Sequence, residues 1–159
     1  MAHSTEHLPR EFIHILRENG GRVTPIVTTL LSHLYQSSRV HSPQQLKEEV
    51  NRILRSDIGF PTIYRALDRL MQCQLVYRMY RDDGQTYFFI CRHPRDAHHH
   101  HFICSSCSKV YEIDMCLAGH FEEHVSENLN ASITKHIIQL EGLCRECRKH
   151  SLPARRRKK

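Results

Sequence analysis

The sequence predicts an α/β (α+β) fold in two domains, a helical first part that ends in a β-hairpin and a smaller second part with both strands and a helix. Three observations lead to this prediction. Four stretches with apolar residues at helical spacing come first, two β-rich runs around a turn follow, and the remainder carries two Cys-x-x-Cys pairs among further β-branched runs. No stretch approaches the ~18 apolar residues of a membrane span, so we expect no membrane partner.

Each of the four helices is predicted from an apolar stripe and its boundary residues. The first covers residues 8–18, the second begins at the N-cap pair Thr24-Pro25, and Pro61 opens the fourth. Ser42 and Gln45 have the spacing of a capping box for the third. The side chains expected in the core are Leu8, Phe12, Ile15, Leu16, Val27, Leu30, Leu31, Leu34, Leu46, Val50, Ile53, Leu54, Ile63, Leu67, Leu70 and Met71.

A hairpin is predicted directly after the fourth helix, from residues 75–80 and 86–91 around Asp82-Asp83-Gly84. Short helices that end in a hairpin describe a winged helix, in which the last helix before the hairpin enters the major groove of DNA. We therefore predict a winged-helix DNA-binding domain over residues 1–91. The alternative is an ordinary solvated helix face. The groups suited to base edges and phosphates on that face are Thr62, Tyr64, Arg65, Asp68 and Arg69.

The rest of the chain is predicted as a hinge at residues 92–98, a small α/β domain at residues 99–150 and a disordered basic tail at residues 151–159. Strands are expected at residues 109–113 and 133–140, with a helix between at 115–129. About 50 residues are few for an independent core, so this domain needs a metal, a partner subunit, or both. The tail carries +5 of the net charge of +6.

Four cysteines form two Cys-x-x-Cys pairs, Cys104 with Cys107 and Cys144 with Cys147. Two such turns supply the four thiolates of a closed tetrahedral Zn²⁺ site, which indicates a structural metal. A redox pair is the alternative. A zinc deaminase is not favoured, because Ile103 and not proline precedes Cys104. The chain start lacks the basic and apolar regions of a secretory signal, so we expect a cytoplasmic protein with thiols rather than disulfides.

The histidine run at residues 98–101 lies three residues before this cysteine pair. On an extended segment, His99 and His101 point to one side while His98 and His100 point to the other. One strand could therefore contribute to two metal sites. A purification tag or a solvated histidine patch is the alternative.

These motifs together resemble the ferric uptake regulator family over residues 10–148. The resemblance rests on Pro61-Thr62-Ile63-Tyr64-Arg65-Ala66-Leu67, the histidine run, Phe102-Ile103-Cys104-x-x-Cys107 and Cys144-x-x-Cys147. It implies a homodimeric transcriptional regulator that binds double-stranded operator DNA when a regulatory metal occupies the hinge. It also implies that the four cysteines hold structural Zn²⁺ and that Tyr64 and Arg65 contact DNA.

Departures from the family pattern indicate which metal is sensed. Iron and peroxide sensors place a histidine where Val40 stands here, and a carboxylate where this chain has Cys91. A cysteine there resembles the zinc-uptake branch, and thiolate with imidazole suits Zn²⁺. The resulting hypothesis is a regulatory Zn²⁺, with Fe²⁺ or Mn²⁺ as alternatives. Its ligands would be Cys91, His99 and His101, with Glu112 as a possible fourth because Tyr77 is a poor zinc ligand at the position relatives use.

Four more histidines are candidates for a further metal site, namely His98, His100, His120 and His136, and the alternative is that they are surface histidines. Val27 stands where the family usually has an arginine, so one phosphate contact is expected to be missing. Cys73 and Cys116 are expected to be core thiols.

The predicted function is a zinc-responsive repressor of metal uptake genes. A peroxide or iron sensor of the same family is the alternative. A zinc enzyme without DNA function is a distant alternative, because no nucleophile–base constellation supports it.

Overall fold

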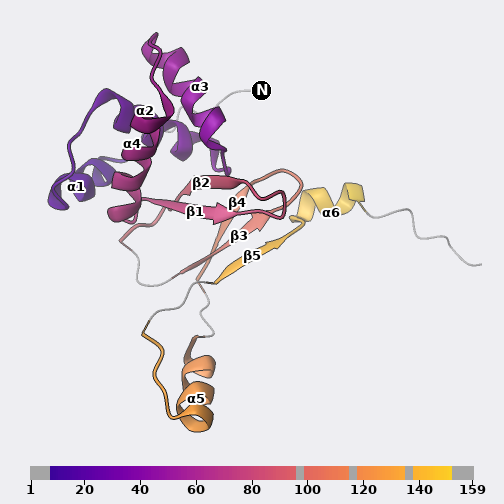
Figure 1. Cartoon of the computed structure of the whole chain (residues 1–159). Coiled ribbons are helices and arrows are strands. Elements are labelled where there is room, and N and C mark those ends of the chain that lie inside the picture. Colours follow the sequence, from indigo (N-terminus) through magenta and orange to yellow (C-terminus); the bar gives the residue numbers. More distant parts are fainter. Residues whose placement is uncertain (1–7, 96–98, 115–117, 135–137, 152–159) are drawn as a thin grey trace, which may run out of the picture. The chain divides into compact units, whose positions relative to one another are not determined.

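The computed structural model describes residues 8–95, 99–114, 118–134 and 138–151. The chain divides into two compact units, Met1–Arg95 and Asp96–Lys159, with the border in the segment expected to be a hinge. Figure 1 labels the elements of both units. The first unit holds α1 (Arg10–Glu18), α2 (Pro25–Ser37), α3 (Pro43–Leu54), α4 (Phe60–Gln72), β1 (Val76–Tyr80) and β2 (Thr86–Ile90). The second holds β3 (His100–Cys104), β4 (Val110–Ile113), α5 (Ala118–Leu129), β5 (Gln139–Gly142) and α6 (Arg145–Ser151).

The starts of α2 and α3 are set by local capping, as the sequence predicts, whereas α4 begins at Phe60, one residue before the predicted Pro61, and has no side-chain cap. The Thr24 side chain accepts a hydrogen bond from the Val27 N–H at the start of α2. At the start of α3, the Gln45 N–H donates to Ser42 Oγ at 3.2 Å and the Ser42 N–H donates to Gln45 Oε1 at 2.8 Å. Both halves of the capping box are therefore present, which satisfies two N–H groups that the helix itself cannot pair.

The core of the first unit is the apolar side of α1 to α4 together with the inner face of the hairpin. Most of the predicted core side chains are fully buried. Ile53 is the clear exception, with 46% of its surface exposed. It lies in the last turn of α3, just before Arg55 adopts a left-handed conformation, while its neighbour Leu54 packs against the core.

The hairpin pairs β1 with β2 antiparallel, from Val76 opposite Ile90 to Tyr80 opposite Thr86. A short bridge extends it, because His41 and Phe88 exchange two backbone hydrogen bonds of 2.8 Å. The helices α1 to α4, followed by a hairpin that is joined to the segment between α2 and α3, form a winged helix, as predicted.

The second unit is built on a three-stranded sheet in the order β4-β3-β5. Strand β3 pairs antiparallel with β4 and parallel with β5. Strand β5 begins at Gln139, later than the predicted run of residues 133–140, of which residues 135–137 lie outside the described residues. Its register with β3 runs from His101 opposite Gln139 to Cys104 opposite Gly142. The mixed helices and strands confirm the predicted fold class.

Helix α5 keeps an exposed apolar side in the single chain. Phe121 is 57% exposed and Leu129 is 69% exposed. The predicted start of this helix at residues 115–117, which includes Cys116, lies outside the described residues. In the described part of the chain, no helix is both long enough and apolar enough to cross a membrane.

Candidate metal centres

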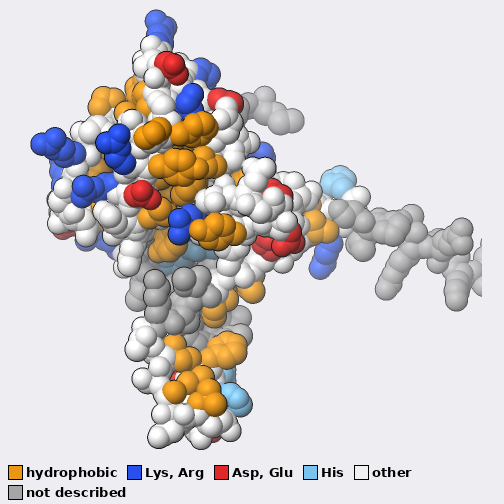
Figure 2. Space-filling view, in the orientation of Figure 1, with side chains coloured by type: hydrophobic (Ala, Val, Ile, Leu, Met, Phe, Trp, Pro, Cys, Tyr) orange, Lys and Arg blue, Asp and Glu red, His pale blue; other side chains and the backbone are white. Residues whose placement is uncertain are grey.

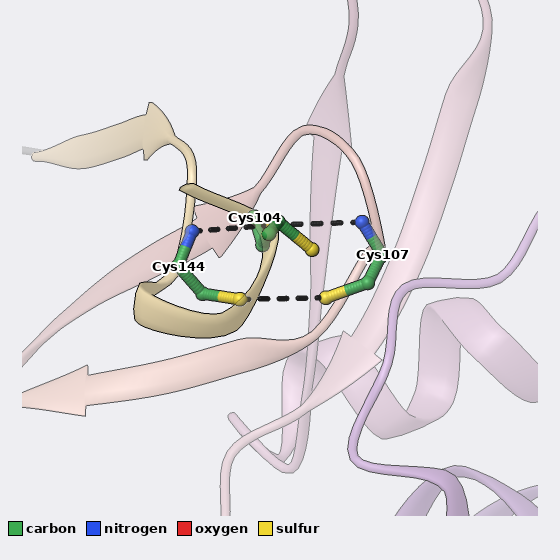
Figure 3. A group of neighbouring side chains, drawn as sticks. Cys104, Cys107 and Cys144 are labelled. Atoms are coloured by element: carbon green, nitrogen blue, oxygen red, sulfur yellow. Dashed lines mark hydrogen bonds between the residues drawn. The ribbon is translucent and has the colours of Figure 1, made fainter. Parts of the chain in front are cut away.

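The four cysteines of the two Cys-x-x-Cys pairs come together in the second unit. Their sulfur atoms all lie within 4.8 Å of one another, and the Sγ atoms of Cys107 and Cys144 are 3.9 Å apart. The first pair lies at the turn from β3 to β4, and the second at the junction of β5 and α6. Figure 3 shows three of these side chains directed toward a common centre. Four sulfurs at such spacing match the donor set of a tetrahedral zinc site.

Backbone N–H groups favour the thiolate form that a metal requires. Burial opposes ionisation of Cys104, but the N–H groups of Cys107 and Cys144 point at its sulfur and lower its pKa to about 6. These N–H groups lie 3.5 Å and 3.3 Å from Cys104 Sγ (Figure 3). The N–H of Cys147 and then the Tyr111 hydroxyl lower the pKa of Cys144. The residues present therefore fit a structural Zn²⁺.

A second group of ligands lies within the same unit, on the β3–β4 pair. Ligand atoms of His99, His101 and Glu112 lie within 4.8 Å of one another. His101 stands directly opposite Glu112 in the β3–β4 register, and the rings of His99 and His101 are 5.0 Å apart. Burial, followed by the neighbouring rings of His99 and His100, lowers the pKa of His101 to about 4. Its imidazole is therefore neutral at physiological pH and has a lone pair for a metal.

Cys91 belongs to the first unit and directly follows β2. Its side chain is fully buried, and its N–H donates to the Leu75 carbonyl at 3.1 Å. Tyr77 stacks on Phe89 with the ring centroids 5.8 Å apart. Burial and the nearby Cys91 thiol raise the pKa of Tyr77, which opposes the phenolate form that a metal would require.

The other predicted histidine site is not assembled by the described residues. His100 is buried on β3, and His120 is exposed on α5. Neither belongs to a group of three or more metal ligands in the described parts of the chain. His98 and His136 lie outside the described residues.

Helix α4 presents the predicted DNA-reading side chains to solvent. Tyr64, Arg65 and Arg69 are exposed and Thr62 is half-buried, while the opposite side of the helix faces the core. Val27, which stands where the family usually has an arginine, is 5% exposed on α2.

Two features of the first unit escaped the sequence analysis. Phe60, the first residue of α4, is an exposed aromatic next to the Lys47 ammonium. Arg92 donates to the Tyr35 carbonyl at 2.6 Å and to Ser38 Oγ at 2.7 Å, and its guanidinium lies 4.5 Å from the centre of the Tyr35 ring. The sequence signal for Phe60 was its position directly before Pro61, at the start of a predicted helix. The Arg92 contacts span more than 50 residues and have no local signature.

A winged helix joined to a small sheet domain with clustered cysteines and histidines defines a metal-binding regulator of transcription. A family model, the ferric uptake regulator family, matches residues 18–141. The chain belongs to this family, whose members are metal-responsive, DNA-binding regulators and not enzymes.

The relatives of this chain are named for different signals, namely iron uptake, peroxide and zinc uptake. The chain is 29% identical over 141 residues to a ferric uptake regulation protein of Campylobacter upsaliensis, with 88% of each chain covered. It is 28% identical over 147 residues to the peroxide-responsive repressor PerR of Staphylococcus aureus, covering 91% of this chain and 94% of the relative. A solved zinc uptake regulator complexed with zinc and DNA is similar in fold, with a TM-score of 0.73, 21% identity, and coverage of 92% and 97%.

Proposed function

We propose that this protein is a zinc-responsive repressor that binds operator DNA as a homodimer and controls metal uptake genes. The observation that carries the proposal is the chemistry of the ligand set. His99, His101 and Glu112 converge in the second unit, and the residue that ends the wing is a buried thiol, Cys91, rather than a carboxylate. Thiolate with imidazole suits Zn²⁺, whereas oxygen-rich sites suit harder ions.

Control of DNA binding follows if Cys91 completes this ligand set. The two units would then contribute donors to one site, so the occupied site favours a single arrangement of the winged helix relative to the second unit. A ligand shifts such an equilibrium only by its differential affinity for the two arrangements, which is why donors from both units are required. In a homodimer, that arrangement sets the distance between the two α4 helices, which must match successive major grooves.

The four-cysteine site would have a separate, permanent role. Its closed sulfur set leaves no position for exchange chemistry, and it links the β3–β4 turn to the start of α6. The second unit is too small to bury much apolar surface, so a structural metal and a partner subunit both stabilise it. The exposed apolar side of α5, with Phe121 and Leu129, is the kind of surface that a homodimer buries.

Substitution of Cys91 tests the regulatory assignment. Mutation of residues that hydrogen-bond to a metal ligand typically costs ~10–100-fold in metal affinity or activity. Cys91→Ser changes a proposed ligand itself, so it should weaken zinc-dependent DNA binding by at least this factor. The assay is a gel shift against free zinc concentration, with DNA enriched from a random pool by the parent protein. Cys73→Ser is the matched control, because Cys73 is also a buried thiol in the first unit but lies outside the ligand set. An unchanged zinc dependence in Cys91→Ser rules out this regulatory site.

A peroxide or iron sensor is the second candidate, and the ligand chemistry favours it. Two imidazoles with the Glu112 carboxylate also suit Fe²⁺ or Mn²⁺. The ferric uptake and PerR relatives are 29% and 28% identical to this chain. Competition among the metals without oxygen, followed by the same gel shift, distinguishes the two. The zinc proposal requires that Zn²⁺ activates DNA binding at the lowest free concentration and that peroxide leaves the zinc-loaded protein active.

A further inference from the structure

The first turns of α4 present two aromatic rings to solvent. Phe60, the first residue of the helix, is 39% exposed, and Tyr64 is 41% exposed one turn later. Their ring centroids are 6.3 Å apart. The other phenylalanines of this unit, Phe12, Phe88 and Phe89, are at most 3% exposed. A single exposed apolar side chain is common, but a pair of rings at the start of a recognition helix is a surface built for contact.

A cation from α3 lies beside the Phe60 ring. The Lys47 ammonium lies 5.5 Å from the centre of the ring, and the exposed Asp57 carboxylate lies 3.8 Å from the same nitrogen. This contact orients the ring and places a positive charge beside it. Figure 2 shows one face of the first unit on which hydrophobic side chains gather with Lys and Arg around them.

The major groove offers one apolar group to such a ring. Hydrogen-bonding groups line the edges of all four base pairs, and thymine adds a C5-methyl group. The N-terminal residues of a recognition helix are those that meet base edges. Phenylalanine has no donor or acceptor, so it gains nothing from the polar edges and buries apolar surface only against that methyl group.

We propose that Phe60 is a specificity-determining residue that reads a thymine methyl group in each half-site, while Lys47 positions the ring and contacts the adjacent phosphate. The proposal rests on the proposed DNA-binding function and adds the base that α4 selects. Tyr64, Arg65 and Arg69 supply hydrogen bonds and phosphate contacts, which the phenyl ring cannot make. Burial of one methyl-sized group corresponds to about a fourfold change in affinity for each half-site.

Deoxyuridine tests the proposal directly, because it differs from thymine only in lacking the C5-methyl group. The zinc-loaded full chain first enriches DNA from a random pool. Each thymine of the enriched duplex is then replaced by deoxyuridine in turn, and binding is measured by fluorescence anisotropy. The parent should bind about fourfold more weakly when the thymine that Phe60 contacts is replaced in one half-site. Replacement in both half-sites should weaken binding about fifteenfold.

Variants of Phe60 test whether its ring causes the sensitivity to the thymine methyl group. Phe60→Ala should bind the thymine duplex more weakly than the parent and show no further weakening on deoxyuridine replacement at the sensitive position. Phe60→Leu, which keeps an apolar side chain, should retain sensitivity there. Ile53→Ala is the matched control, because Ile53 is a comparably exposed apolar residue elsewhere in the first unit. It should behave as the parent does.

Two outcomes overturn the proposal. One is a parent that tolerates deoxyuridine at every position, and the other is a Phe60→Ala variant that keeps the full methyl sensitivity of the parent. If the zinc-loaded parent enriches no DNA, the proposed function itself fails and this proposal fails with it. Thermal unfolding of Phe60→Ala and Phe60→Leu separates weaker DNA recognition from a damaged fold.

Discussion

Acid should destabilise the first unit through His41, which lies between α2 and α3. The His41 ring centroid is 4.7 Å from that of His33, and its Nε2 atom is 2.7 Å from Ser37 Oγ. Burial is the main cause that lowers the pKa of His41 to about 4, and the His33 ring and the Arg39 charge act in the same direction. The folded state therefore keeps this ring neutral at a pH where an exposed histidine is protonated.

The sign of the pH effect follows from the two pKa values. The unfolded chain binds a proton at His41 near its ordinary pKa of 6.5, whereas the folded chain does so only near 4. Stability from this residue is complete above pH 7 and is lost as the pH falls from 6.5 toward 4. At pH 5 the full shift corresponds to about 2 kcal/mol of lost unfolding free energy, and partial solvation of the ring reduces this to roughly 1–2 kcal/mol.

The assay is urea unfolding of the full chain at pH 7 and pH 5, followed by far-UV circular dichroism. From pH 7 to pH 5, the unfolding free energy of both proteins should fall. Because His41→Gln lacks the titrating ring, its loss should be smaller than that of the parent by roughly 1–2 kcal/mol. His14→Gln, at an exposed histidine on α1, is the control for a general histidine effect. Equal decreases in the parent and His41→Gln, or an NMR titration of the His41 ring with a midpoint near 6.5, would refute the reasoning.

Three more outcomes follow from the geometry. Cys107→Ser should release the tightly held zinc and unfold the second unit, seen as a lower metal content by elemental analysis and a weaker circular dichroism signal, while Cys73→Ser keeps both. Arg92→Ala should lower the unfolding free energy by about 1–3 kcal/mol, because two hydrogen bonds and a cation–π interaction disappear, and Arg92→Lys should recover only part of this in thermal unfolding. Arg69→Ala should reduce the slope of log affinity against log salt by about 0.9 for each phosphate that the variant no longer neutralises, and an unchanged slope excludes Arg69 from the interface.

The helices and the cysteine site were predictable because their signals are local. Thr24-Pro25 and the Ser42–Gln45 capping box act within one turn of chain, and both are present as predicted. Two Cys-x-x-Cys turns bring four thiolates to one metal with little dependence on the surrounding fold. The alternation along β3 also follows from backbone geometry, since His99 and His101 share a side.

Other features depend on segments that are distant in sequence, and no local pattern encodes them. Strand β5 pairs with β3 from Gln139 opposite His101, a register that its own residues do not specify. Ile53 follows the apolar stripe of α3, yet it is 46% exposed, while Leu54 in the same turn packs against the core. Glu112 joins His99 and His101 only through the β3–β4 pairing.

Periodicity, capping and metal-ligand spacing in the chain therefore establish which elements form and which side chains can hold a metal. Packing in the folded chain decides which side chains are buried and which groups they contact, since the neighbours of an imidazole or a phenyl ring are residues far away in sequence. His41 becomes a half-buried neutral base only when α2 packs beside α3. Phe60 becomes an oriented, exposed ring only when α3 places Lys47 against it, because interaction energies depend on distance in space and not on separation in sequence.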